Sequence, residues 1–266
     1  MKRFLALVLG AAAIAACDKN SNPIATSPAV GANVKFFNFG VGAPGVAFYA
    51  NDQKVTAVSS SNCQPPNDTT AVCLSTGNDS TAGTAYGGAS SGGLYNVFAA
   101  TQSTLTGRIA AVRANHVTIA TVSTSLAEGK YYSYYMSGIY DATSKTVEAF
   151  VVEDPIPATV DPTQAYVRFV NAVSNSDPMT LFAKNTTTSV EGAVGGTVAY
   201  KAAGAFTAIL PGAYDLNTRT AGSATNVITR TGVTFAPGRV YTISSRGDMV
   251  STVTANKPAL DNTANR

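Results

Sequence analysis

The amino-acid sequence contains one unit written twice, and this repeat constrains the fold more than any other feature. The segment Ala32–Asn38 (ANVKFFN) matches Ala165–Asn171 (AYVRFVN), and three later blocks match in the same order. Several matching blocks in one order are the signature of a duplicated structural unit. We therefore expect two homologous domains, over residues 32–153 and 165–256. The later blocks pair Val46–Ala50 with Met179–Ala183, Leu94–Leu105 with Ala205–Leu216, and Leu126–Tyr132 with Phe235–Tyr241.

The first block of each copy has the alternation of a β-strand. Val34 and Phe36 are apolar, whereas Lys35 between them is charged. The second copy keeps this phase, with Arg168 at the position of Lys35. Because successive side chains of a strand point to opposite faces, a charge held on one face indicates a half-buried strand.

The rest of the chain also reads as strands separated by turns. Val, Thr, Tyr and Phe recur in short runs, and Gly, Pro, Asn and Asp interrupt them every 8–12 residues or so, which is typical of sandwiches. Pro-Gly at 211–212 and 237–238 marks tight turns. The sequence predicts an all-β protein made of two tandem immunoglobulin-like β-sandwich domains.

Two further segments are expected to carry little regular structure. Residues 154–164 contain three prolines and are predicted to be a semi-extended linker that restricts the angle between the domains without fixing it. Residues 257–266 follow the last matching block and are expected to form a tail.

The N-terminus predicts a lipid anchor. Lys2 and Arg3 precede a 13-residue apolar run, which is too short for a membrane-spanning helix and suits a signal peptide over residues 1–16. The run ends at Cys17 in a sequence that resembles a bacterial lipobox, and the alternative is an ordinary secretion signal with a chance cysteine. We expect Cys17 to be lipidated and residues 17–31 to be a flexible tether. The folded part would then be held at a bacterial envelope membrane, with the choice of membrane and of face open.

Charge excludes nucleic acid as the partner. The chain has 18 Lys and Arg against 15 Asp and Glu, and loss of Lys2 and Arg3 with the signal peptide leaves a balance of +1. A phosphate backbone demands clustered basic residues, and no such cluster exists.

The two remaining cysteines predict a disulfide. Cys63 and Cys73 form an even pair in a chain expected to reach an oxidising compartment. Both lie in a segment where the first copy has about 20 residues more than the second. A bridge across so short a loop would stabilise the fold by roughly 2–3 kcal/mol. The braced insertion is either a binding element or a tolerated surface insertion, with two free thiols as the alternative to the bridge.

These blocks together carry a family resemblance. The tandem of AxVRFVN, a Pro-Gly-x-Tyr turn at 211–214 and a Phe-Ala-Pro-Gly-Arg-x-Tyr-Thr segment at 235–242 resembles the DUF4397 family of bacterial envelope proteins. The first copy departs at Ala99-Ala100, where Pro-Gly would be expected. The resemblance implies only an immunoglobulin-like sandwich, because the family is one of unknown function with no catalytic residues to carry over.

Two short motifs suggest enzymes but lack the required context. Gly88–Gly92 matches the nucleophile pattern G-x-S-x-G around Ser90, yet residues 91–115 before His116 contain no acidic residue. Gly40–Gly45 matches a dinucleotide fingerprint, but a strand rather than a helix is expected to follow it. We therefore predict no enzymatic activity and no cofactor, with a serine hydrolase using Ser90 and His116 as the alternative from a different class of function.

Metal ligands are scarce in the sequence. One histidine and no Cys-x-x-Cys spacing predict no metal site of the zinc type. Calcium takes oxygen ligands, which Asn175, Asp177 and the pair Asn67-Asp68 could supply, so whether the protein binds calcium stays open.

A tyrosine-rich strand supplies the candidate binding site. Within Tyr131–Tyr135, comparison with Tyr241 and Ile243 of the second copy predicts that Tyr132 and Tyr134 point inward. Tyr131 and Tyr135 are then expected to form an exposed stripe suited to a sugar or a protein partner, with packing against the second domain as the alternative. The sequence as a whole predicts a non-catalytic envelope lipoprotein with a binding or structural role, whose partner is an envelope protein or a glycan.

Overall fold

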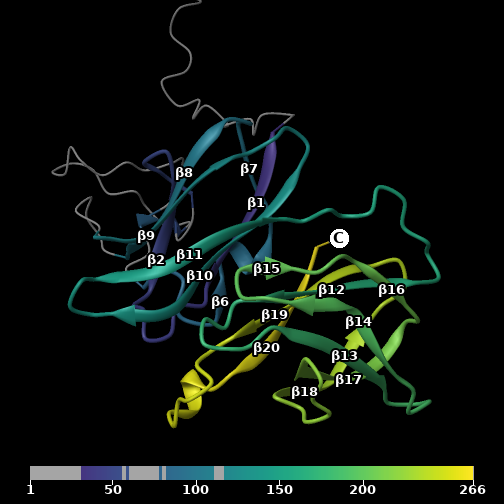
Figure 1. The fold of residues 1–266 in the computed structure, drawn as a ribbon. Coiled ribbons are helices and arrows are strands. Elements are labelled where there is room, and N and C mark those ends of the chain that lie inside the picture. The colour runs from purple at the N-terminus through teal and green to yellow at the C-terminus, as the bar shows by residue number, and fades with distance from the viewer. Residues whose placement is uncertain (1–30, 56–57, 60–77, 80–81, 111–116, 266) are drawn as a thin grey trace, which may run out of the picture.

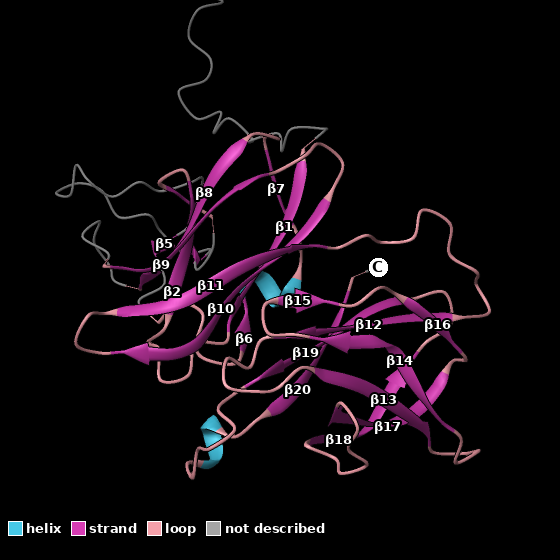
Figure 2. Ribbon diagram, viewed as in Figure 1, coloured by secondary structure: helices cyan, strands magenta, loops and turns pink. Residues whose placement is uncertain are grey.

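The computed structural model describes residues 31–55, 58–59, 78–79, 82–110 and 117–265. Regular structure in these residues is β-sheet, with two short 3-10 turns at Ser90–Gly93 and Thr254–Asn256 (Figure 2). The all-β prediction is therefore confirmed. Cys17, Cys63, Cys73 and His116 lie outside the described residues, so the expectations for them stay predictions.

The N-terminal half forms two main sheets and a small two-stranded sheet. One main sheet has the order β11-β10-β1-β6, with β7 also pairing β1, and the other has the order β3-β2-β8-β9. The small sheet pairs β4 with β5. The strands are β1 (Ala32–Asn38), β2 (Val46–Ala50), β3 (Gln53–Lys54), β4 (Val58–Ser59), β5 (Asn78–Asp79), β6 (Gly88–Ala89), β7 (Asn96–Phe98), β8 (Gln102–Ile109), β9 (Thr118–Ser125), β10 (Tyr131–Asp141) and β11 (Thr146–Glu153).

The C-terminal half forms two sheets of the same kind (Figure 1). Their orders are β15-β12-β19-β20, with β16 also pairing β12, and β14-β13-β17-β18. The strands are β12 (Ala165–Asn171), β13 (Met179–Asn185), β14 (Glu191–Val198), β15 (Ala202–Ala203), β16 (Thr207–Ile209), β17 (Gly212–Thr220), β18 (Ile228–Phe235), β19 (Val240–Arg246) and β20 (Ala259–Ala264).

The two halves repeat the same topology and the same register. In each, the first strand pairs parallel with the tyrosine-containing strand, β1 with β10 and β12 with β19. Val34 lies opposite Tyr132, and Val167 lies opposite Tyr241. These matches are compatible with the predicted tandem domains, and they extend the sequence repeat to strand pairing.

Each half encloses its core between its own two sheets. Val34 and Phe36 are buried in the N-terminal core, and the matching Val167 and Phe169 are buried in the C-terminal core. Burial of each such side chain stabilises the folded state by about 1.5–3 kcal/mol. The inward phase predicted for the first strand of each copy is correct.

The inward tyrosines also hold the turn that precedes their strand. The hydroxyl of Tyr132 accepts the backbone N–H of Ala127 at 3.0 Å, and that of Tyr241 accepts the N–H of Ala236 at 3.1 Å. Each ring belongs to its core or packs against it, and so does Tyr134. Tyr132 and Tyr134 therefore point inward as expected.

Residues 257–265, expected to belong to a tail, contain a strand of the sheet instead. Six of them form β20, which pairs antiparallel with β19 from Arg246↔Ala259 to Tyr241↔Ala264. The last matching block ended before this strand, and for that reason the sequence comparison missed it. By the register, β20 corresponds to β11 of the N-terminal half.

The two halves are packed against each other through the sheets that contain β1 and β12. A separate apolar cluster lies between these sheets, and we call this buried contact surface the junction. The described C-terminal end lies beside it (Figure 1). The outer face of β1 and β12, expected to face solvent, is therefore covered by the opposite half. The buried members of the cluster are Phe37, Phe39, Tyr135, Phe150, Val170 and Ala172.

No helix within the described ranges has the length and apolar character needed to span a membrane.

Candidate functional site at the junction of the two halves

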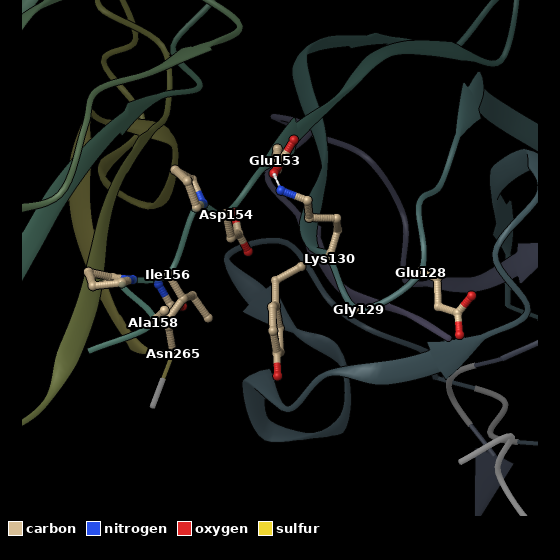
Figure 3. Close-up of a pocket in the computed structure, with 11 residues that line it drawn as sticks. Glu128, Gly129, Lys130, Glu153, Asp154, Ile156, Ala158 and Asn265 are labelled. Atoms are coloured by element: carbon tan, nitrogen blue, oxygen red, sulfur yellow. Dashed lines mark ion pairs between the residues drawn. The ribbon is translucent and has the colours of Figure 1, made fainter. Parts of the chain in front are cut away.

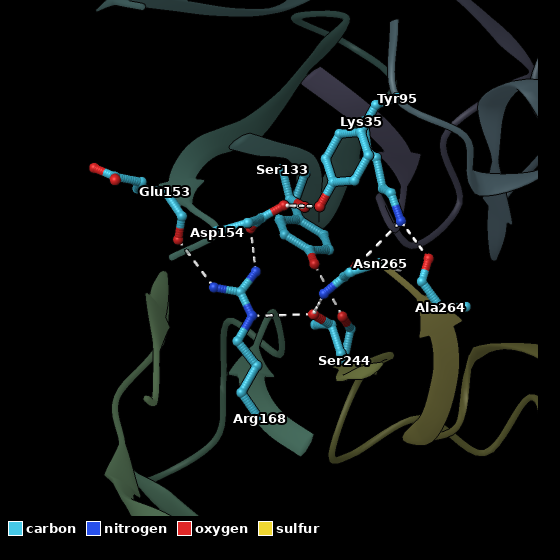
Figure 4. A network of polar contacts seen from close by, with 11 residues as sticks. Lys35, Tyr95, Ser133, Glu153, Asp154, Arg168, Ser244, Ala264 and Asn265 are labelled. Atoms are coloured by element: carbon cyan, nitrogen blue, oxygen red, sulfur yellow. Dashed lines mark hydrogen bonds and ion pairs between the residues drawn. The ribbon is translucent and has the colours of Figure 1, made fainter. Parts of the chain in front are cut away.

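The junction contains two buried cations at the same place in the repeat. Lys35 is 1% exposed and Arg168 is fully buried, although alternation placed both on the outer face of their strands. An unpaired buried charge is strongly unfavourable, so each cation needs a set of oxygen acceptors. Both find these acceptors in the opposite half (Figure 4).

Arg168 is held by the end of β11 in the N-terminal half. Its Nη1 donates to the carbonyl oxygen of Glu153 at 2.9 Å, and its Nη2 forms an ion pair with Asp154. Its Nε donates to Thr242 Oγ1 at 3.0 Å. Asp154 was expected to begin a semi-extended linker, but it is 1% exposed and belongs to the junction instead.

Asp154 is satisfied on both carboxylate oxygens. While Oδ1 pairs with Arg168, Oδ2 accepts hydrogen bonds from the Tyr95 hydroxyl and from Ser133 Oγ, each at 2.7 Å. Burial, and next the negative charge of Asp154, raise the pKa of Tyr95. The Tyr95 hydroxyl therefore keeps its proton and remains a donor to the carboxylate.

The buried charge of Lys35 is stabilised less than that of Arg168, because Lys35 bonds neutral oxygens and Arg168 bonds a carboxylate. Its Nζ donates to the carbonyl oxygen of Ala264 at 2.5 Å and to Asn265 Oδ1 at 3.0 Å, and lies 4.3 Å from the centre of the Tyr95 ring. Burial lowers the pKa of Lys35 to about 8, and the attraction of Asp154 offsets only part of that effect.

This lowered pKa predicts how stability changes with pH. Between about pH 8 and 10.5 the folded protein has released the Lys35 proton while the unfolded chain still holds it. Stability rises with pH wherever the unfolded state binds more protons. Relative to Lys35→Met, the free energy of unfolding of the wild type is expected to rise by about 2 kcal/mol between pH 7.5 and 10, as measured by urea unfolding.

The comparison with Lys35→Met removes the opposing effect of the tyrosines. Burial raises the pKa of Tyr135 to about 12, so stability from this residue is lost above pH 10 in both proteins. If the free energies of unfolding of the wild type and Lys35→Met instead change in parallel with pH, Lys35 stays charged over this range. Burial would then not lower the pKa of Lys35.

Tyr135 lies at the centre of the junction and is not exposed. Its ring stacks on Phe37 at 4.6 Å and 10° and on Phe150 at 5.1 Å and 19°. Its hydroxyl shares a hydrogen bond of 3.0 Å with Ser244 of the opposite half. The expected exposed stripe of Tyr131 and Tyr135 is therefore wrong for Tyr135, because the second half covers that face of β10.

Tyr131 remains partly accessible and lines an open cleft. The cleft encloses about 640 Å³ at one edge of the junction (Figure 3). The Tyr131 ring packs edge-on against Tyr95, with centroids 4.9 Å apart. Lys130 and Glu153 form an ion pair of 3.0 Å on the same wall. The cleft residues are Glu128–Tyr131, Glu153–Ala158 and Asn265.

Of the residues considered for catalysis or metal binding, His116, Asn67 and Asp68 lie outside the described residues, and the described ones do not assemble a site. Ser90 is buried in a 3-10 turn, and its hydroxyl has no hydrogen-bond partner there. The described ranges contain no group of three His, Cys, Asp or Glu arranged for a metal. Asn175, considered for calcium, instead donates to Asp248 at 2.7 Å and accepts the N–H of Met249 at 3.1 Å.

Sequence reasoning found Tyr131 but missed the polar network beneath it. The one available signal was the cation shared by both copies, Lys35 and Arg168. A charge kept at the same strand position in two diverged copies indicates a partner as readily as it indicates solvent. The partner of Arg168, Asp154, lies in the proline-containing segment, which matches no block of the other copy.

Comparisons with known proteins show no family for this chain. No protein-family model matches the chain, and no curated protein matches it. One solved structure that matches the chain is a "putative cell adhesion protein" from Bacteroides ovatus, 12% identical, with 89% of this chain and 96% of that chain covered and a TM-score of 0.22. The function proposed below therefore rests on the residues of this chain.

Proposed function

We propose that the protein is a non-catalytic lipoprotein of the bacterial cell envelope, held by a lipid on Cys17, with a binding or structural role. The cleft that contains Tyr131 carries this proposal, because it offers an aromatic ring and charged groups to a partner. The polar groups of the junction next to it are already satisfied by one another. These hydrogen bonds join the walls of the cleft. A ligand would therefore contact the residues at the mouth of the cleft, such as Tyr131 and Lys130.

Comparison of the two copies favours a functional reason for the aromatic ring of Tyr131. The matching residue on β19 is Val240, which is fully buried. The fold therefore accepts a smaller aliphatic side chain at this position. A half-buried tyrosine there adds an accessible ring that the equivalent place in the other half lacks.

A glycan is the ligand class that these groups suit, and it is the second part of the proposal. The apolar face of a sugar packs on an aromatic ring, and tyrosine serves partly wet sites because one end of it is polar. Glu128 and Glu153 add carboxylate acceptors for sugar hydroxyls, and Lys130 adds a donor. An envelope protein partner is the alternative occupant.

The test is glycan-array binding by the mature chain carrying Tyr131→Val or Tyr131→Phe. Tyr131→Val copies the second half and removes the ring, so we expect binding to fall at least about tenfold, a loss of about 1.4 kcal/mol. Tyr131→Phe keeps the ring and should retain most of the affinity. A wild type that binds no glycan rejects the glycan assignment, and equal binding by Tyr131→Val places any ligand outside the cleft.

A further inference from the structure

The two cations of the junction make the same contacts in opposite directions. Arg168 of the C-terminal half bonds the carbonyl of Glu153 and the side chain of Asp154. Lys35 of the N-terminal half bonds the carbonyl of residue 264 and the side chain of residue 265. Since Glu153 lies opposite Tyr132 and residue 264 lies opposite Tyr241, the two acceptor pairs occupy the same place in the repeat.

The groups around each acceptor are repeated as well. The N–H of Asp154 donates to the carbonyl of Tyr131, and the N–H of Asn265 donates to the carbonyl of Val240, both at 2.7 Å. Ser133 on β10 and residue 242 on β19 occupy matching positions, and both contact the acceptor side chain of their own half. Ser133 Oγ donates to the Asp154 carboxylate at 2.7 Å. The hydroxyl of residue 242 accepts a hydrogen bond from Asn265 Nδ2 at 2.6 Å.

Each cation also lies over an aromatic ring of its own half. Lys35 Nζ is 4.3 Å from the centre of the Tyr95 ring, and the Arg168 guanidinium carbon is 4.9 Å from that of Phe206. Tyr95 and Phe206 are matching residues of the Leu94–Leu105 and Ala205–Leu216 blocks. One clamp, consisting of a cation, a ring and a strand end, is thus used twice.

A second reciprocal pair lies further along the same strands. Ser137 Oγ of the N-terminal half shares a hydrogen bond of 2.8 Å with the Tyr200 hydroxyl of the C-terminal half. At the matching position on β19, the Arg246 guanidinium lies 5.1 Å from the centre of the Tyr86 ring in the N-terminal half. Tyr86 and Tyr200 correspond, because the following residue in each case donates its N–H to the carbonyl of the repeat asparagine, Asn38 or Asn171.

The residues at the centre of the junction contact their own counterparts. Tyr135 and Ser244 occupy matching positions and share a hydrogen bond. A surface in which residue i contacts j, and the copy of j contacts the copy of i, is an isologous twofold interface. The junction therefore has the form of a homodimer interface, with its axis close to Tyr135 and Ser244.

Residue sizes make this pairing selective. At three matching positions around the centre of the junction, the N-terminal half supplies the larger side chain and the C-terminal half the smaller one. Two N-terminal halves would overfill the centre, and two C-terminal halves would leave it empty, and both errors cost stability. The matched pairs are Phe37 with Val170, Phe39 with Ala172, and Tyr135 with Ser244.

We propose that the junction is a dimer interface enclosed within one chain, in which each half is the specific binding partner of the other. The pairing rests on the two clamps and on the size match at the axis. It therefore holds without the covalent connection through residues 155–164.

The test is to cut the connection in the folded, full mature chain. A protease recognition sequence inserted between Ala158 and Thr159, where both residues are exposed, allows cleavage after folding. Native mass spectrometry and size-exclusion chromatography at micromolar concentration are expected to show one complex with one N-terminal and one C-terminal fragment. Free fragments, or complexes of two identical fragments, would overturn the proposal.

Two substitutions show whether the junction holds the cut fragments. Ser244→Arg places a long cation against Tyr135 and is expected to release the fragments after cleavage. Thr231→Arg adds the same residue at an exposed position of β18 and should leave the complex intact. If Ser244→Arg prevents folding of the uncut chain, the stoichiometry of the cut wild type still decides between the outcomes.

Discussion

Asp154→Asn is expected to lower the free energy of unfolding by about 3–5 kcal/mol, because it leaves the buried Arg168 without a counter-ion. The wild-type carboxylate serves three donors at once: Arg168, Tyr95 and Ser133. An amide cannot neutralise the guanidinium, and its NH₂ group would face one of these donors. Urea unfolding at pH 7 measures the change.

An exposed ion pair of the same junction provides the matched control. Glu148 and Lys201 pair across the two halves at 2.6 Å, but their side chains are 54% and 40% exposed. Glu148→Gln is therefore expected to cost at most about 1 kcal/mol. Arg168→Met added to Asp154→Asn should recover part of the loss by removing the stranded charge. A cost for Asp154→Asn as small as that for Glu148→Gln would mean that water reaches the pair.

Tyr135→Ala and Tyr131→Ala are expected to differ sharply in stability, although the sequence placed both residues on one exposed face. Tyr135 is fully buried between Phe37 and Phe150, so its truncation should cost about 3–5 kcal/mol, as for other large buried aromatic side chains. Tyr131 lies at the mouth of the cleft, and Tyr131→Ala should cost about 1 kcal/mol or less.

Tyr135→Phe separates the ring from the hydroxyl. It keeps the stacked ring and loses the hydrogen bond to Ser244, so about 1 kcal/mol is expected. Denaturant midpoints of the three variants, measured together, check the order. Similar small losses of stability for Tyr135→Ala and Tyr131→Ala would mean that both tyrosines are exposed. That result would contradict the burial of Tyr135 in the junction.

The repeated strand pattern could be predicted because alternation reports which residues share a face. Val34 and Val167 are both buried in the core of their own half, as the duplication requires. Alternation does not report what covers the other face. Lys35 and Arg168 therefore looked like solvent-facing charges, whereas each is buried against the opposite half.

The junction was hidden because its acceptors lie outside the blocks that match. Asp154 begins a proline-containing segment, and Asn265 follows a strand that has no visible sequence counterpart. Pairing between segments more than a hundred residues apart in the chain, such as Tyr135 with Ser244, leaves no local pattern. For this reason Tyr131 could be proposed from sequence alone and the network beneath it could not.

The most direct test of the account is the distance between the two halves in solution. Nitroxide labels at Thr121→Cys on β9 and Thr231→Cys on β18, both exposed positions, would report it by pulsed electron spin resonance, in a chain whose native cysteines are replaced by serine. A single narrow distance distribution, broadened by Ser244→Arg, is the predicted result. A broad distribution in the chain with an unaltered junction would show that the halves move independently, and would contradict the account.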